Sequence, residues 1–187
     1  MNTKIIGVVI VIIVLIAIWL FVPLDGIIPV SAATHTVSDE SIKNAEQEVM
    51  AGLKDISLVT PNVLKWDNGD SGEFALLVHN TDKGNDKDFF VNVFLENVGN
   101  GIEDIDKYKT STSGWFTFNK RLQLKADEIK TVNMITKPSL SSDSGAYIFR
   151  IVVCRTDGIA SPEAPEDCTL GAGSHIYSTT SFAIQLN

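Results

Sequence analysis

The chain has few of the residue types on which catalysis and cofactor binding usually depend. Its 187 residues include only three histidines and two cysteines. It has no Gly-x-Ser-x-Gly sequence and no Gly-Lys pair of the kind that ends a phosphate-binding loop. His35, His79 and His175 are far apart along the chain, and no pattern predicts a common site for them. We therefore expect no catalytic residue, no metal ligand and no cofactor, and predict that the protein is not an enzyme.

Positive charge is also scarce. The sequence has 15 Lys and Arg residues against 23 Asp and Glu residues, which gives a net charge of -8. Lys4 and Asp25 are the only charged residues among the first 32, so the remainder also carries -8. A polyanion such as nucleic acid is repelled by this balance, and we expect no nucleic-acid partner.

One long hydrophobic run is present, IIGVVIVIIVLIAIWLFV at residues 5–22. As a helix it would be about 27 Å long, close to the thickness of the hydrocarbon core of a bilayer. Lys4 precedes the run and no Lys or Arg follows it before Lys43, so the positive-inside rule predicts a cytoplasmic N-terminus and an external C-terminal domain. We interpret residues 1–23 as a single-pass transmembrane anchor or uncleaved signal in the cell membrane, in contact with lipid. Its residues include Ile5, Val14, Trp19 and Val22.

Two other fates of this segment stay open. Val30-Ser31-Ala32 and Ser31-Ala32-Ala33 both have small residues suited to a signal peptidase, so the protein is alternatively a secreted ligand-binding module cut near Ala32. The run is longer than the usual 7 to about 15 residues of a signal sequence and ends about ten residues before these positions, which favours retention. The third interpretation is a pilin-like filament subunit, with Thr3 to Gly7 as a weak processing site.

Cys154 and Cys168 are the only cysteines, and they lie in the part of the chain that we expect outside the cell. Pairs of cysteines in that environment usually form a disulfide. The intervening residues contain two prolines and four acidic residues and no histidine. This composition favours a disulfide over a metal site or a reactive thiol.

The N-terminal part after the hydrophobic run has two predicted segments. Residues 24–37 contain two prolines and small residues, and indicate an extended tether. Residues 38–54 predict an amphipathic helix that begins at Ser38, a good capping residue. Its apolar positions have helical spacing, so the helix either packs on the domain or contacts a neighbouring chain. These positions are Ile42, Ala45, Val49 and Leu53.

From residue 55 to 187 the hydrophobic period changes to two, which predicts an all-β fold. Because the strands alternate between apolar and polar residues, we expect an immunoglobulin-like antiparallel β-sandwich, with Trp66 and Trp115 in its core. The expected strands are 56–60, 72–80, 88–97, 114–118, 121–124, 129–137, 146–154 and 180–186.

Two loops rich in Asp and Asn allow an alternative to plain turns. Residues 67–73 and 80–88, together with Glu103, Asp104 and Asp106, offer the oxygen ligands that calcium prefers. Neither loop has the twelve-residue pattern that ends in a glutamate, and Asp, Asn and Gly are also the ordinary residues of turns. We interpret both loops as turns.

The stretch from residue 114 to 153 has a recognisable order of residues. It resembles the second half of the immunoglobulin-like NEW3 and CARDB modules of bacterial and archaeal surface proteins, and residues 76–99 resemble an earlier strand pair of the same modules. Ala126-Asp127 stands where Pro-Gly is usual. The resemblance implies a structural, spacer or adhesive role at the cell surface, no catalytic residues, and self-association or contact with other surface proteins. The matching positions are Leu124, Glu128, Val132, Met134, Pro138, Gly145, Tyr147, Phe149 and Ile151.

Overall fold

The computed structural model describes residues 32–99, 105–156, 168, 173 and 175–187. The hydrophobic run at residues 5–22, with Ile5, Val14, Trp19 and Val22, lies outside the described residues. Within the described ranges, no helix is both long and apolar enough to cross a membrane. Ala32–Asn187 form one compact unit.

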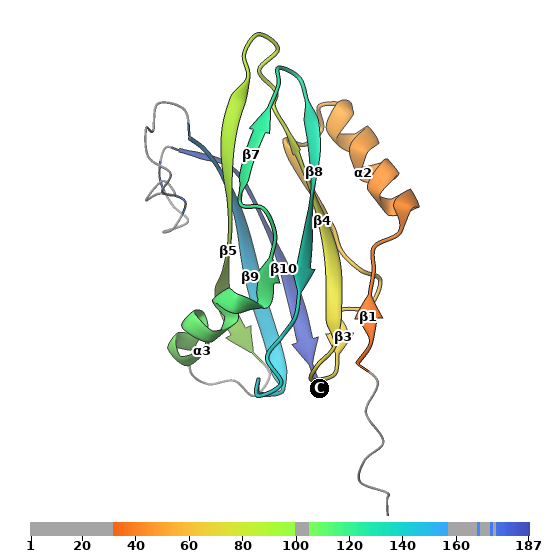
Figure 1. Cartoon of the computed structure of the whole chain (residues 1–187), viewed down its shortest axis with the longest axis vertical. Coiled ribbons are helices and arrows are strands. Elements are labelled where there is room, and N and C mark those ends of the chain that lie inside the picture. The colour runs from red at the N-terminus through yellow and green to blue at the C-terminus, as the bar shows by residue number, and fades with distance from the viewer. Residues whose placement is uncertain (1–31, 100–104, 157–167, 169–172, 174) are drawn as a thin grey trace, which may run out of the picture. The chain divides into compact units, whose positions relative to one another are not determined.

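Two β-sheets face each other across a hydrophobic core (Figure 1). In the first sheet, the long central strand β4 pairs with β8 along one edge and with β1 and β2 along the other, while β6 pairs with β8. The β1–β4 pairing is parallel and the others are antiparallel. The strands of this sheet are β1 (Thr34–His35), β2 (Ile56–Val59), β4 (Ser71–His79), β6 (Phe116–Thr117) and β8 (Ile129–Thr136).

The second sheet has the order β3-β10-β9-β5-β7. Only β3 is parallel to its neighbour, and it pairs with the last residues of β10. The strands are β3 (Lys65–Trp66), β5 (Lys87–Gly99), β7 (Arg121–Leu124), β9 (Gly145–Arg155) and β10 (Ile176–Leu186). This arrangement is the two-sheet all-β sandwich that the alternating sequence predicts, so the fold class is confirmed for the described part of the chain.

Strand β4 is buried on both faces. Phe74, Leu76 and Val78 point into the core between the sheets, while Ala75 and Leu77 lie under helix α2 (Asp39–Met50) on the outer face. This double burial explains why residues 74–78 are an unbroken apolar run instead of an alternating one.

Helix α2 covers the outer side of the first sheet, at the right of Figure 1. The Oγ of Ser38 accepts a hydrogen bond from the backbone N–H of Ser41 at 3.1 Å, which caps the first turn. Gly52 has a φ of 71° after the last turn, and its N–H donates to the carbonyl of Val49. The helix therefore packs on its own domain, and Leu53 lies beyond its end with 73% of its surface exposed.

Some expectations for individual elements were wrong. Residues 114–118 do not form one strand: a 3-10 turn (Ser113–Trp115) places the Trp115 indole in the core, and only β6 follows. Helix α3 (Ile105–Thr112) was not expected, because only Tyr108 and Thr112 are buried along it. Within the expected tether, Thr34 and His35 already belong to the first sheet.

We expect Gly72→Ala to destabilise the domain. A Cβ at Gly72 would overlap the indole ring of Trp66, which is completely buried. Overpacking of this kind costs about 1–3 kcal/mol of unfolding free energy. The measurement is the urea midpoint of the variant against that of Gly114→Ala, because a Cβ at Gly114 meets no atom within 4 Å. Equal midpoints for the two variants would contradict the close packing of Trp66 on β4.

Candidate functional site

The three histidines do not share a site. His35 is opposite Gly72 at the start of β4, and its Nε2 lies 3.2 Å from an Asp70 carboxylate oxygen. His79 is at the far end of the same strand, where its Nε2 lies 3.0 Å from Asp127. His175 precedes β10 and its carbonyl accepts from the N–H of Arg155. The three histidines therefore lie in three separate environments.

Asp70 is a buried carboxylate that binds the start of the described chain. Its Oδ1 accepts a hydrogen bond from the N–H of Ala33 at 2.7 Å, and its Oδ2 accepts from the N–H of Asp67 at 3.0 Å. Burial alone would raise the pKa of Asp70, but these two amides and His35 together hold that pKa below its ordinary value. Asp70 is therefore ionised at neutral pH, and its carboxylate holds the backbone of Ala33 against the turn that precedes β4.

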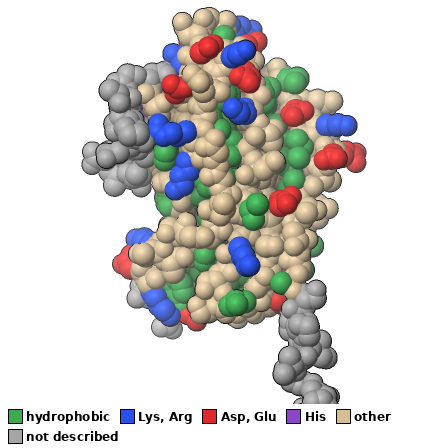
Figure 2. Space-filling view, in the orientation of Figure 1, with side chains coloured by type: hydrophobic (Ala, Val, Ile, Leu, Met, Phe, Trp, Pro, Cys, Tyr) green, Lys and Arg blue, Asp and Glu red, His purple; other side chains and the backbone are tan. Residues whose placement is uncertain are grey.

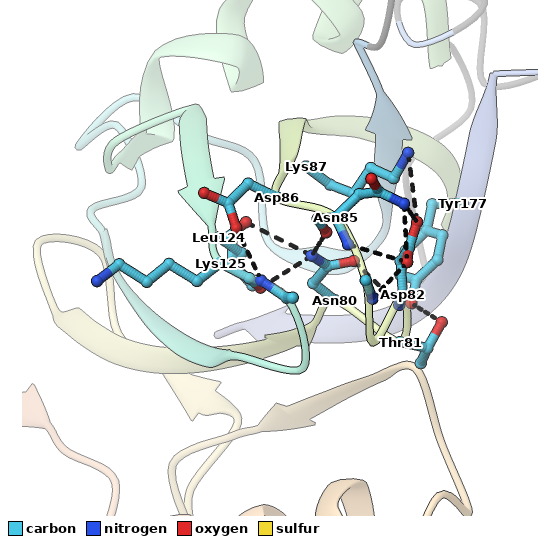
Figure 3. Close-up of polar contacts among 11 residues, drawn as sticks. Asn80, Thr81, Asp82, Asn85, Asp86, Lys87, Leu124, Lys125 and Tyr177 are labelled. Atoms are coloured by element: carbon cyan, nitrogen blue, oxygen red, sulfur yellow. Dashed lines mark hydrogen bonds and ion pairs between the residues drawn. The ribbon is translucent and has the colours of Figure 1, made fainter.

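At the opposite end of β4, Asn80 joins two loops (Figure 3). Its side chain is 1% exposed, and its Nδ2 donates to the carbonyls of Asn85 at 2.9 Å and Lys125 at 2.8 Å. Its Oδ1 accepts from the N–H of Asp82 at 3.2 Å. The amide thus holds the loop after β4 against the turn between β7 and β8.

Asp82, one of the loop carboxylates that could bind calcium, accepts hydrogen bonds from its own loop. Asp82 Oδ1 accepts from the N–H of Gly84 at 2.9 Å and from that of Asn85 at 3.1 Å. The Gly84 amide and the Asn85 side chain lower the pKa of Asp82, and Lys87 adds to the effect. In the residues that the structure covers, no three His, Cys, Asp or Glu side chains are close enough to hold a metal ion. Glu103 and Asp104 lie outside the described residues.

The disulfide between Cys154 and Cys168 is present, with their Cα atoms 5.8 Å apart. Both residues are fully buried with Phe90 and Val152 on the outer face of the second sheet. The side-chain amide of Asn92 donates to the carbonyl of Cys168 at 3.1 Å. The bond therefore fixes Cys168 against β5 and β9.

A groove of about 610 Å³ lies between the edges of the two sheets. Because the N–H of His79 donates to the carbonyl of Asp55, the alternating ladder leaves the backbone groups of Ile56 and Leu58 pointing away from β4. Four of the ten lining residues are Ser or Thr, and open strand edges of this kind can pair with an extended polypeptide. The groove is lined by Gly52, Leu53, Lys54, Asp55, Ile56, Ser57, Leu58, Ser178, Thr179 and Thr180.

Charge on the visible face is mixed. Figure 2 shows acidic and basic side chains interspersed over this face, with hydrophobic side chains in small separate areas. Several pairs are within ion-pair distance, among them Lys54 with Glu48 at 2.7 Å. Exposed pairs of this kind contribute little to stability. This face therefore has no continuous charged surface that would select an ionic ligand.

No protein-family model matches the sequence, and no curated protein matches it either. Solved structures with a similar fold share little sequence. A FixG-related protein from Vibrio parahaemolyticus is 8% identical over 71% of this chain and 94% of that chain, with a TM-score of 0.41. The CARDB domain of a Pyrococcus furiosus protein, solved with di-metal ions, is 13% identical over 70% and 89%, with a TM-score of 0.39.

Native Escherichia coli alpha-2-macroglobulin is 9% identical over 71% of this chain but only 7% of its own length, with a TM-score of 0.41. Because all of these TM-scores are low, the fold assignment rests on the strand pairing of this chain. The sequence resemblance implied a two-sheet β-sandwich, and the strand pairing of this chain confirms it at the level of the fold.

We expect Asn80→Ala to lower the unfolding free energy by about 2–3 kcal/mol, because the buried Asn80 amide loses its hydrogen bonds to the carbonyls of Asn85 and Lys125 and the one from the N–H of Asp82. Urea unfolding measures the loss. The matched control is Asn133→Ala on the exposed face of β8, where a change within about 0.5 kcal/mol is expected. Similar midpoints for the two variants would show that Asn80 does not hold the loops.

We expect Asp70→Asn to destabilise the domain at pH 7 and much less at pH 2–3. The pKa of Asp70 is lowered in the folded state, so its contribution is present above the unfolded value of 3.8 and lost as the pH falls through the folded value. Unfolding midpoints across this range measure the difference. Asp67→Asn is the matched control, because it makes the same change of charge in the same turn. The Asp67 carboxylate is exposed and accepts a hydrogen bond from the side chain of Asn187. If Asp70→Asn lowered the unfolding free energy by the same amount at every pH, the ionised Asp70 carboxylate would not be the stabilising group.

Proposed function

We propose that this protein is a non-enzymatic, membrane-anchored immunoglobulin-like domain displayed outside the cell, with a structural, spacer or adhesive role. The disulfide between Cys154 and Cys168 carries the proposal, because disulfides persist in oxidising compartments and are rare in the cytosol. The hydrophobic run at residues 5–22 supplies the anchor and the reason for export.

The polar groups of the domain support a binding or structural role over catalysis. Asp70, Asn80 and Asp82 are engaged in hydrogen bonds that hold loops and strands together. The groove between β2 and β10 has the free backbone donors and acceptors of Ile56 and Leu58 along β2, and Asp55 is the one carboxylate among the described residues that line it. An extended segment of another surface protein fits such edges better than a small reactive substrate does.

The anchor is tested by removing the hydrophobic run. We expect the full chain to remain in membranes after a high-salt and alkaline wash, with an unprocessed N-terminus. Deletion of residues 5–22 should release the protein from the membrane fraction, whereas Val14→Leu, which keeps the run apolar, should not. Recovery of the unmodified protein wholly in the soluble fraction would overturn the anchor.

Display outside the cell needs a separate measurement. An added protease should digest the domain on intact cells, and protein taken from those cells should have no free thiol before reduction and two after it, as expected for the Cys154–Cys168 disulfide. Protection from the protease on intact cells, together with two free thiols, would contradict external display. A start near Val8 instead of at Met1 or Asn2 would favour the filament subunit.

A further inference from the structure

Strand β10 has an open edge over most of its length. On one side it pairs with β9, and on the other side β3 pairs only with Gln185 and Leu186, near the lower end of β10 in Figure 1. No other described strand pairs with β10. The path of the chain explains this gap, because it leaves the first sheet after Val59 and joins the second sheet only at Lys65. Among the described residues, the part of β10 before Gln185 therefore has no strand beside it on this side.

The hydrogen bonds at the end of β10 show which backbone groups face the open side. Gln185 donates its N–H to the carbonyl of Leu64, away from β9. The pairing of β10 with β9 is regular beyond the bulge at the start of β10, so the direction of the backbone groups alternates along it. Thr179, Ser181 and Ala183 therefore direct their N–H and carbonyl groups to the open side. All three residues are exposed.

The opposite side of the sandwich is better protected against strand pairing. Its edge strands are β6, with two residues, and β7, with four. Arg121 lies on β7 and Lys120 directly precedes it, and both short length and positive charge keep an edge from pairing. The open stretch of β10 is Ser178–Ala183, which has no charged residue and no proline. An extended segment can add to such an edge through main-chain hydrogen bonds.

The groove beside this edge has one unpaired charge. Residues 178–180 form one of its walls, and Lys54 and Asp55 lie on the other. The Nζ of Lys54 is 2.7 Å from a carboxylate oxygen of Glu48, so its charge is already paired. No Lys, Arg or His side chain of the described residues is within ion-pair distance of the exposed Asp55 carboxylate. A ligand with one positive charge therefore complements the groove.

We propose that β10 binds an extended segment of a partner protein as an additional antiparallel strand along Ser178–Ala183. The segment has about six residues, because β3 closes the lower end of the edge. Its residues are small or apolar, except for a lysine or arginine at its C-terminal end that pairs with Asp55. Antiparallel pairing is slightly more stable than parallel pairing, and it places that end beside the start of β10. This site deepens the adhesive role proposed above and rests on it.

A second copy of this chain fits the edge less well than a partner segment does. Two chains with a net charge of -8 each repel one another. In a symmetric antiparallel pair of β10 strands, the start of one strand lies opposite the end of the other, where β3 already occupies the edge. A single extended segment with a positive charge meets neither obstacle.

The test measures amide hydrogen exchange of the full chain in detergent micelles, resolved to single residues. The probe is a peptide with blocked ends, about six residues long, in which valine and threonine alternate and lysine is last. We expect the peptide to slow exchange of the Thr179 and Ser181 amides about tenfold, which is the factor for a site that is nine-tenths occupied. Exchange of the Gln123 amide on β7 should not change.

Two proline variants separate the β10 edge from a general effect of the peptide. Thr179→Pro removes an N–H that faces the open side and is not used in the pairing with β9, so it should abolish the slowing at Ser181. Gln123→Pro is the matched control. Gln123 also points away from its neighbouring strand, since the carbonyl of Lys120 accepts a hydrogen bond from β5. This variant should leave the effect of the peptide unchanged.

The charge of the ligand is tested with Asp55→Asn. This variant should bind the lysine peptide about threefold more weakly than the unmodified chain does, as expected for the loss of an opposite-charge pair across two strands. An otherwise identical peptide that ends in threonine should bind both chains equally. Equal binding of the two peptides to the unmodified chain would overturn the pairing with Asp55.

Unchanged exchange at about 5 mM lysine peptide, well above the roughly 1 mM Kd of a weak complex, would overturn the docking site. Equal effects of Thr179→Pro and Gln123→Pro, or slowing at Leu58 of β2 instead of at β10, would overturn the assignment to β10. Slowing that rises with protein concentration and needs no peptide would assign the edge to a second copy. Deletion of residues 5–22 decides membrane anchoring separately, so failure of this site is distinguishable from failure of the anchored domain.

Discussion

Burial of β4 on both faces is the constraint on which the rest of the domain depends. One face of the strand completes the core against β9 and β10, and the other is closed by Ala45 and Val49 of α2. A strand in this position must be apolar at every residue from Phe74 to Val78. Helix α2 is therefore a third layer of the fold, and without it Ala75 and Leu77 would face water.

The sequence predicted the long strands well, because one face of each meets the core and the period of two is clear. Strands β4 and β9 were predicted within one residue at each end, while β10 begins four residues before its expected start. Short elements were missed for the opposite reason. Strands β1 and β3 have two residues each, and Thr34 and His35 become a strand only because β4 offers a partner 37 residues later. A strand of two residues is too short to show an alternation of apolar and polar side chains.

The polar sites were harder to predict than the strands. Asp70 and Asn80 are common turn residues, and nothing local separates a buried network from an ordinary turn. Their roles come from partners distant in sequence: Ala33 for Asp70, and Lys125, 45 residues away, for Asn80. The left-handed backbone of Asp127, with a φ of 59°, lies in the same turn as Lys125, where Ala126-Asp127 replaces the usual Pro-Gly. The unusual Ala126-Asp127 pair marked this turn in the sequence. It did not indicate that Asp127 has a left-handed backbone or that Asn80 binds the turn.

Both described ends of the unit lie beside one turn. Ala33 is bonded to Asp70, and the N–H of Asn187 donates to the carbonyl of Trp66, the residue directly before the turn at residues 67–70. Strand β4 then runs for nine residues, or about 30 Å, before it reaches Asn80. The Asn80 loop and the turn at Lys125 therefore lie at the end of the domain opposite Ala33, about one strand length away.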